Sequence, residues 1–547
     1  LNIPTHIDLE QYDNLLAFYD DVISRFRSQS AFTSLGRTIS FGELDSYANA
    51  FAHYLQNNTD LKTGDRIALQ LPNIIQSPVA FLGALRAGLI VVNVNPLYTA
   101  TELEHQFNDA GVKALVVLAN IADTVATVID KTAIETVIVT ELADLHKSPK
   151  RQLLNFAIKH IKKMIPDFTI PKAIGFTEVM KKSAGKKPDL AQPKLNDTAV
   201  LQYTGGTTGV AKGAMLSHGN ILANMLQAAP IFDTYNLSDK DECMVQPLPL
   251  YHIYAFTVSL VILSKGGHTV LIPNPRDLPA LVKELGKWKF SAFCGLNTLF
   301  VALCRYPAFK SVDFSHLKVT LSGGMALTEY ATNLWQDVTG TPIYEGYGLT
   351  ETSPIVSVNN GKALRLGTIG MPLPMTQIDI RDDEHNSMPI GERGELCVKG
   401  PQVMQGYWQR PEATAATIID DWLYTGDIAI LDEDGYLRIV DRKKDMILVS
   451  GFNVYPNEIE DTVCKHEFVL EACAVAAKDE KTGEAVHLYL VKTCPKQALN
   501  EADIISYCRE YLAAYKVPKK VFFKQELPKS NVGKILRREV RENAQAA

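Results

Sequence analysis

Through the first two-thirds of the chain, short apolar runs alternate with helix-like segments. One such segment, Ser77–Arg86, is amphipathic and lies between two of the runs. The apolar runs are short enough to be buried strands; they are Arg66–Leu71, Leu89–Val94, Ala114–Leu118, Thr136–Val139, Thr269–Ile272, Ser291–Gly295 and Leu317–Ser322. Alternation of strands and helices is typical of parallel sheets with helices on both faces. The pattern therefore predicts an α/β fold with doubly wound sheets.

The pattern changes twice in the last third. From about Gly367, glycine and proline separate the short strands Gln377–Arg381, Gly394–Lys399 and Tyr436–Val440. Residues 367–441 are therefore expected to form a small β-rich, barrel-like subdomain. After the charged run that begins at Asp441, the tail has its own strands and helix at Ala472–Ala476, Val486–Val491 and Ile504–Leu512. A chain of 547 residues is long enough for several domains. We expect an N-terminal domain of residues 1–441 and a small, mobile α+β C-terminal domain of residues 442–547.

Composition narrows the class of protein. A net charge of −6 argues against nucleic acid as the main partner. The eight cysteines are scattered without a C-x-x-C pair, which favours buried thiols in a reducing compartment over disulfides or a zinc site. No apolar run is long enough to span a bilayer, so we expect a cytoplasmic location.

The segment Arg151–Ile165 places Leu154, Ile158, Ile161 and Ile165 on one helical face, with lysines elsewhere. A helix packed on its domain is favoured, and peripheral contact with the inner face of a membrane is the alternative.

A run of small residues follows the predicted strand Thr198–Gln202. It contains Tyr203, Thr204, Gly205, Gly206, Thr207, Thr208, Gly209, Lys212 and Gly213. Glycines let several backbone N–H groups point toward one anion, threonine hydroxyls add donors, and lysine adds positive charge. The run is not a Walker A loop, because Lys212 is followed by Gly213 instead of Ser or Thr. It predicts a phosphate site, although a flexible turn explains the run equally well when it is considered alone.

Four further segments add aromatic, acidic and basic groups. They are Tyr347–Pro354, Trp422–Asp427, Asp441–Pro456 and Pro528–Arg537. With these segments, the chain resembles the adenylate-forming superfamily of acyl-CoA synthetases, luciferases and peptide-synthetase adenylation domains. More narrowly, it resembles bacterial long-chain fatty-acid–CoA ligases. The resemblance covers nearly the whole chain, with five motifs in the same order.

The resemblance implies an enzyme that uses ATP and Mg²⁺ to convert a fatty acid into an acyl-adenylate. It assigns Lys534 to a bridge between the carboxylate and the α-phosphate, and Thr350 to the α-phosphate. Glu351 and Thr204 would hold the metal, Tyr347 with Gly323 and Gly324 would contact adenine, and Asp427 with Arg442 would bind ribose. Without the family resemblance, the alternative interpretation of Glu351 is a helix cap, that of Asp427 is an ordinary turn residue, and that of Lys534 is a turn residue in solvent.

The resemblance also implies a second step in which coenzyme A takes the acyl group. The C-terminal domain would rotate about Lys444, and Gly451 would then line the pantetheine channel. His252 and Phe256 would belong to the acyl pocket, with Phe256 as its gate; a core histidine and a core phenylalanine are the alternatives.

The sequence departs from the family pattern at Asp420, Asp421 and Tyr424, which leaves the acyl length open. A medium-chain or aryl-acid ligase, an adenylation module for a carrier protein, and a fatty-acid uptake or binding protein are the alternatives. Whether the chain forms a homodimer is also left open.

Overall fold

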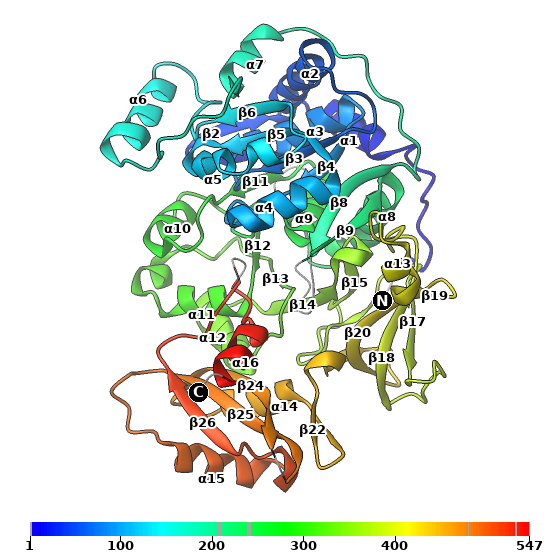
Figure 1. The fold of residues 1–547 in the computed structure, drawn as a ribbon, viewed down its shortest axis with the longest axis vertical. Coiled ribbons are helices and arrows are strands. Elements are labelled where there is room, and N and C mark those ends of the chain that lie inside the picture. Colours follow the sequence, from blue (N-terminus) through cyan, green and yellow to red (C-terminus); the bar gives the residue numbers. More distant parts are fainter. Residues whose placement is uncertain (1–2, 205–210, 238–241, 480, 531–532, 546–547) are drawn as a thin grey trace.

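The computed structural model describes residues 3–204, 211–237, 242–479, 481–530 and 533–545 (Figure 1). Its first large sheet has seven strands, all parallel except for the antiparallel pair at one edge. In spatial order these are β7 (Ile174–Gly175), β6 (Thr136–Thr140), β5 (Val112–Leu118), β3 (Arg66–Gln70), β4 (Ile90–Asn93), β8 (Thr198–Thr204) and β9 (Lys212–Ser217). The β8–β9 pair is a hairpin, so it brings both ends of the predicted phosphate loop to one sheet edge.

The second large sheet has nine strands with a mainly parallel centre. In spatial order these are β16 (Met371–Pro372), β15 (Ile355–Val358), β14 (Ile343–Gly348), β13 (Val319–Ser322), β12 (Ala292–Gly295), β10 (Cys243–Gln246), β11 (His268–Leu271), β1 (Ser30–Ser34) and β2 (Arg37–Ser40). In parallel α/β sheets, ligands bind beyond the carboxyl ends of the strands. The ends of β13 and β14 are therefore the natural place to look for a site.

Helices lie between the two sheets and on their outer faces. The largest apolar core contains residues from both sheets and from α1 (Leu15–Phe26), α2 (Phe41–Asn58), α3 (Gln76–Arg86), α8 (His218–Asp233) and α9 (Ile253–Ser264). Further cores include α4 (Ala100–Ala110) and α5 (Ala122–Ala126) with the first sheet, and α10 (Leu278–Leu285), α11 (Asn297–Arg305) and α12 (Glu329–Thr339) with the second. Several helices start at capping boxes, such as Ser40 with Glu43 before α2. The predicted α/β class is confirmed.

Two smaller sheets follow. The first contains β17 (Gln377–Arg381), β18 (Arg393–Lys399), β20 (Trp422–Leu431), β19 (Ile418–Ile419) and β21 (Leu437–Arg442), with α13 (Pro411–Thr417) beside it. The second contains β23 (Phe452–Val454), β22 (Ile447–Val449), β25 (Gly483–Lys492), β24 (Val469–Asp479) and β26 (Lys520–Lys524). Its helices are α14 (Pro456–Cys464), α15 (Glu501–Tyr511) and α16 (Arg537–Gln545). Figure 1 shows this last sheet at the opposite end of the molecule from the seven-stranded sheet.

The segment Arg151–Ile165 differs from the continuous helix that its apolar spacing predicts. Helix α6 (Lys150–Phe156) passes into a π-helical turn, η3 (Ala157–Ile161), and neither contains a buried residue. A π turn holds more residues than an α turn, so it rotates the following side chains off the expected face. Leu154, Ile158 and Ile165 are half-buried as expected, but Ile161 is 71% exposed.

In the described part of the chain, no helix is long and apolar enough to cross a membrane. A further helix, α7 (Phe176–Lys182), packs on α2.

Candidate active site

A cavity of about 1410 Å³ lies where the nine-stranded sheet, the β-rich subdomain and the C-terminal part of the chain meet. The ends of β13 and β14 form one wall, β20 and β21 another, and residues 529–530 and 534–539 a third. Most of the residues assigned by the family resemblance line it: Tyr203, Thr204, His252, Gly323, Gly324, Tyr347, Thr350, Glu351, Asp427, Arg442, Lys444 and Lys534. Segments more than 300 residues apart in the sequence thus contribute to one site.

The predicted phosphate loop leaves the sheet between β8 and β9. Gly205, Gly206, Thr207, Thr208 and Gly209 lie outside the described residues. At the loop base, Tyr203 pairs with Gly213 and Thr204 with Lys212. A Cβ on Gly213 would lie 2.9 Å from the Tyr203 ring, so the hairpin needs glycine there. The Tyr203 hydroxyl donates to Asp109 Oδ2 at 2.7 Å, which fixes the ring at the base of the loop.

The next part of the site is acidic. Thr350 and Glu351 lie in a short 3₁₀ turn, η5 (Thr350–Thr352), directly after β14. The Tyr407 hydroxyl donates to Glu351 Oε1 at 2.7 Å, and Lys212 Nζ lies 5.1 Å from the centre of the Tyr407 ring. Tyr407 therefore connects the phosphate loop to the acidic turn. The Glu351 side chain receives this hydroxyl instead of capping a helix. No motif had indicated Tyr407, because its two contacts arise only in the folded chain.

The acidic turn suits a metal ion only with help from a ligand. In the described part of the chain, no group of three or more His, Cys, Asp or Glu side chains is placed to hold a metal ion. Glu351 has a second carboxylate oxygen besides the one that Tyr407 contacts, and Thr204 lines the same cavity. Mg²⁺ in nucleotide sites is typically held by one or two carboxylates together with phosphate oxygens and water. The residues present therefore fit Mg²⁺ that arrives with a polyphosphate.

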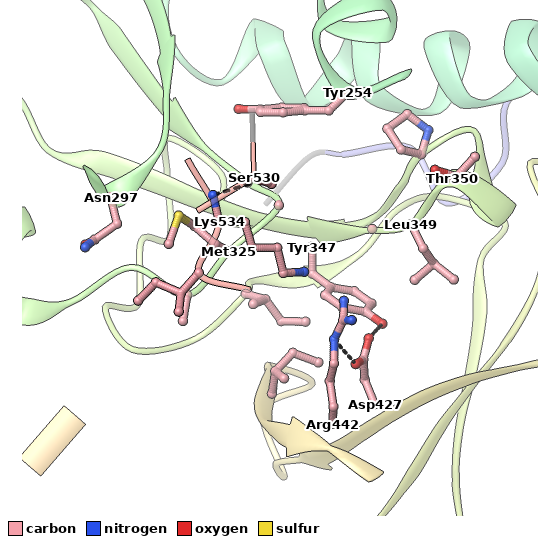
Figure 2. Close-up of a pocket in the computed structure, with 18 of the residues that line it drawn as sticks. Tyr254, Asn297, Met325, Tyr347, Leu349, Thr350, Asp427, Arg442, Ser530 and Lys534 are labelled. Atoms are coloured by element: carbon pink, nitrogen blue, oxygen red, sulfur yellow. Dashed lines mark hydrogen bonds and ion pairs between the residues drawn. The ribbon is translucent and has the colours of Figure 1, made fainter. Parts of the chain in front are cut away.

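Tyr347, Asp427 and Arg442 form a trio in the cavity, joined by one hydrogen bond and one ion pair. Tyr347 donates its hydroxyl to Asp427 Oδ2 at 2.5 Å, and Arg442 Nε lies 3.5 Å from Asp427 Oδ1 (Figure 2). Burial and the nearby Asp427 carboxylate raise the pKa of Tyr347 well above its ordinary value, so the hydroxyl keeps its proton. The trio presents a fixed carboxylate next to an aromatic ring, and Gly323 and Gly324 line the same cavity. This arrangement suits a nucleoside, whose hydroxyls can donate to the carboxylate.

Lys534 enters the cavity from the C-terminal domain. Its backbone N–H donates to Ser530 Oγ at 3.1 Å, and Figure 2 shows it beside Ser530 and Tyr347. The preceding Gly533 has φ +84°, and a Cβ there would lie 2.7 Å from Thr298 Oγ1 of α11, so glycine lets this loop contact the N-terminal domain. Burial, with Arg442 and Lys444 nearby, lowers the pKa of Lys534 to about 7. The lysine is therefore placed where a negatively charged ligand would restore its proton.

A second set of charges joins the two domains next to the predicted hinge. We call Asp441, Asn457, Glu460 and Arg537 the hinge cluster. Asp441, at the end of β21, is fully buried; it accepts from Asn457 N at 2.7 Å and from Arg537 Nη1 at 3.2 Å. Arg537 also donates to Glu460 Oε2 at 2.5 Å. Burial raises the pKa of Asp441 to about 6, although Arg537 opposes the rise. Lys444, the predicted pivot, lies three residues after Asp441 in the turn η6 (Lys443–Asp445). The motif spacing gave no sign of the contact between Asp441 and Arg537.

The residues assigned to the acyl pocket divide into two places. His252 lines the main cavity and also caps α9, where its Nδ1 accepts from Tyr254 N at 3.3 Å. Burial and the nearby Lys534 lower the pKa of His252 to about 4, so it is neutral at pH 7. Phe256 instead borders a second, apolar cavity of about 20 Å³ that Phe81, Phe32 and Leu260 also line. The Phe256 and Phe81 ring centres are 4.6 Å apart. A hydrocarbon chain could enter this second cavity only if these rings moved.

Gly451, assigned to the pantetheine channel, lies in the turn between β22 and β23 with φ +84°. It is exposed, and the described residues that line the main cavity do not include it. In this arrangement of the domains, Lys534 is inside the site and Gly451 is outside it.

Known proteins are similar to this chain over nearly its whole length. A family model described as AMP-binding enzyme matches residues 19–408, and one described as AMP-binding enzyme C-terminal domain matches residues 458–534. A protein of Escherichia coli O6:H1 named long-chain-fatty-acid–CoA ligase is 50% identical over 547 residues, covering 99% of this chain and 97% of that protein. A protein of Yersinia pestis with the same name is 48% identical over 545 residues, covering 99% of this chain and 96% of that protein. The crystal structure of an anthranilate CoA ligase in complex with anthranoyl-AMP superposes with a TM-score of 0.87 at 23% identity, covering 99% of each chain. This last likeness concerns the fold alone.

Proposed function

Because the chain belongs to the family of AMP-binding enzymes, we propose that it activates a long-chain fatty acid with ATP and transfers the acyl group to coenzyme A. The observation that carries the residue assignments is the meeting of Lys534, Glu351 and the Tyr347–Asp427–Arg442 trio around one cavity. These groups supply what adenylation of a carboxylate needs: positive charge, a metal ligand and a nucleoside site.

In the first step, a carboxylate oxygen of the fatty acid attacks the α-phosphorus of ATP, and the bond to pyrophosphate breaks. The product is a mixed anhydride of the fatty acid and AMP. Protonated Lys534 lies between the carboxylate and the α-phosphate and offsets their negative charges, while Thr350 donates to the α-phosphate. Glu351 and Thr204 would hold Mg²⁺, which neutralises charge on the triphosphate when bound. Asp427 and Arg442 position the ribose.

In the second step, the thiol of coenzyme A gives its proton to solvent, its sulfur bonds to the acyl carbon, and the bond from that carbon to the phosphate oxygen of AMP breaks, so AMP leaves. This step has no use for a cation at the former α-phosphate bridge, so Lys534 withdraws as the C-terminal domain rotates about Lys444. The same rotation brings Gly451 toward the site, where its lack of a side chain leaves room for pantetheine. The present positions of Lys534 inside and Gly451 outside support the assignment of this arrangement to the first step.

Two alternatives differ from this proposal in testable ways. A medium-chain or aryl-acid ligase would prefer short or aromatic acids, and a fatty-acid uptake or binding protein would release no pyrophosphate. The test is pyrophosphate release by the purified protein with ATP and fatty acids of increasing length, with and without coenzyme A. We expect activity that increases with chain length and acyl-CoA that forms only when coenzyme A is present. A preference for benzoate or for short acids would overturn the long-chain assignment, and the absence of pyrophosphate with every acid would overturn the ligase assignment.

A further inference from the structure

A projecting segment at the edge of the N-terminal domain has no part in the proposed chemistry. It comprises residues 147–172, which include α6 and η3, and we call it the basic arm. Figure 1 shows α6 at the margin of the molecule, at the end opposite the C-terminal sheet. A partner bound to the arm would therefore leave the cavity and the C-terminal domain unobstructed.

The basic arm exposes large apolar side chains close together. Leu153, Phe156, Ile161 and Met164 are 67%, 59%, 71% and 49% exposed. They are four of the fourteen exposed large apolar residues in the described part of the chain, and they fall within twelve consecutive positions. Scattered exposed apolar residues are ordinary, whereas a cluster of them typically marks a binding surface.

The same segment carries strong positive charge. It contains seven basic residues, namely Lys147, Lys150, Arg151, Lys159, Lys162, Lys163 and Lys172, against a single acidic residue, Asp167. The arm thus carries a charge of +6 in a chain whose net charge is −6. In the described part of the structure, none of the seven forms an ion pair. Their charges are therefore available to an anionic partner.

The arm is held in place by hydrogen bonds to the domain. Asn155 accepts from Ala143 N and donates to Asp144 Oδ1, both at 3.0 Å, and Asn120 Nδ2 donates to Met164 O at 2.9 Å. Lys150 Nζ donates to Gly36 O at 3.3 Å in the turn between β1 and β2. These contacts use polar groups, so they leave the apolar cluster exposed.

The arm also lies close to the second, apolar cavity. The turn that it contacts follows β1, and Phe32 of β1 lines that cavity beside Phe256. Gly36 is four positions after Phe32 along the chain: β1 ends at Ser34, and Leu35 and Gly36 form the turn that the arm contacts.

From these observations we propose that the basic arm binds the surface of an anionic lipid membrane. The apolar cluster would enter the acyl region while the lysines contact anionic headgroups, which is the arrangement expected of an interfacial segment. A symmetric contact between the arms of two copies is disfavoured, because two arms of charge +6 repel each other. Nucleic acid would match the lysines but not the apolar cluster. Membrane binding itself does not depend on the proposed ligase activity, although a fatty acid is a membrane amphiphile and would be abundant there.

The test is co-sedimentation of the purified full-length protein with vesicles. We expect it to bind vesicles of phosphatidylcholine mixed with phosphatidylglycerol and to bind pure phosphatidylcholine much more weakly. The combined variant Lys159→Glu, Lys162→Glu and Lys163→Glu should weaken binding about 100-fold or more, since each cation near an anionic surface contributes about fivefold. Lys478→Glu, Lys496→Glu and Lys520→Glu together change the same charge at exposed positions of the C-terminal domain, and they are the matched control.

A second pair of variants tests the apolar cluster. Phe156→Ser with Ile161→Ser should weaken vesicle binding at least tenfold. The control Ile390→Ser with Leu366→Ser, at residues 62% and 60% exposed in and directly before the β-rich subdomain, should not weaken it. All four variants should keep the wild-type melting temperature and the activity toward fatty acid dispersed in detergent. Binding by either arm variant at the wild-type affinity, or an equal loss in its control, would overturn the proposal. So would a wild-type protein that does not sediment with anionic vesicles, or an arm variant whose main defect is loss of a dimer or of binding to RNA.

Discussion

The cost of burying the charge of Lys534 affects how readily the two domains close on each other. A fall in its pKa from 10.5 to about 7 corresponds to about 5 kcal/mol, at about 1.4 kcal/mol per pH unit. This is the approximate cost of placing the protonated lysine in the cavity without ligands. The anionic phosphates of ATP and the fatty-acid carboxylate would offset most of it. We therefore expect the closed arrangement of the domains to depend on ligands.

The pH dependence has a definite sign. With its pKa lowered, Lys534 holds fewer protons in the closed form than in an open form with the lysine in water. Below pH 7 the lysine is protonated in both forms, and the full cost opposes closure. As pH rises from 7 toward 10.5, the cost decreases because the lysine becomes neutral in the closed form first. The closed fraction of the ligand-free wild type should therefore increase over this range.

The substitution Lys534→Met removes the charge and keeps an unbranched apolar side chain of similar length. Relative to the wild type at pH 7, it should favour the ligand-free closed form by about three orders of magnitude. Its closed fraction should lack the rise between pH 7 and 10.5 that the titration of Lys534 gives the wild type. Energy transfer can report closure, between a dye on Cys494, the exposed cysteine of the C-terminal domain, and a second dye on Leu366→Cys. Lys496→Met, at an exposed lysine, is the control. Equal closed fractions in the wild type and Lys534→Met at pH 7, or the same pH dependence in both, would refute this explanation.

Three further substitutions test the site. Lys444→Pro should slow thioester formation at least tenfold while leaving adenylation intact, because a fixed φ hinders rotation; a wild-type rate of thioester formation in single-turnover kinetics would place the hinge elsewhere. Gly533→Ala should slow adenylation at least tenfold, because φ +84° and the contact with Thr298 both disfavour a Cβ, and coupled pyrophosphate release would show whether it does. Phe256→Ala should alter the fatty-acid length profile without changing ATP binding. A drop of roughly 3–5 kcal/mol in stability with an unaltered profile would instead show a packing role alone.

The sequence predicted strands best where the apolar pattern and the hydrogen-bonded ladder end together. β17 was predicted with its observed bounds, Gln377–Arg381. β24 and β25 are longer than the predicted Ala472–Ala476 and Val486–Val491, because their antiparallel pairing continues to Asp479 and Gly483. Half-buried and exposed residues in that extension can pair through the backbone without an apolar signature. Hydrophobic pattern alone therefore locates the core of a strand and misses its polar ends.

The site was predicted through family motifs, and the structure adds contacts that motifs do not contain. Glu351 and Tyr407 are 56 residues apart, and Asp441 and Arg537 are 96 residues apart. Neither pair has a local spacing that brings the partners together, since each depends on how segments far apart in the sequence pack in the folded chain. The exposure of Ile161 was missed for a different reason, because a π turn interrupted the assumed 3.6-residue period. The assigned roles of the motif residues remain predictions for the half-reaction assays.

The hinge cluster bears on how much ATP the enzyme would waste. Arg537 follows Lys534 by three residues, and Asp441 precedes Lys444 by three, so a rotation about Lys444 that withdraws the lysine must also separate Asp441 from Arg537. Withdrawing one partner from a buried ion pair is costly, of order 3–5 kcal/mol when the other is left uncompensated. The adenylate would therefore stay enclosed until that separation occurs, and during this time water has little access to the anhydride. A weaker contact would let the domain leave earlier and more often, and the loss would appear as AMP and pyrophosphate formed in excess of acyl-CoA.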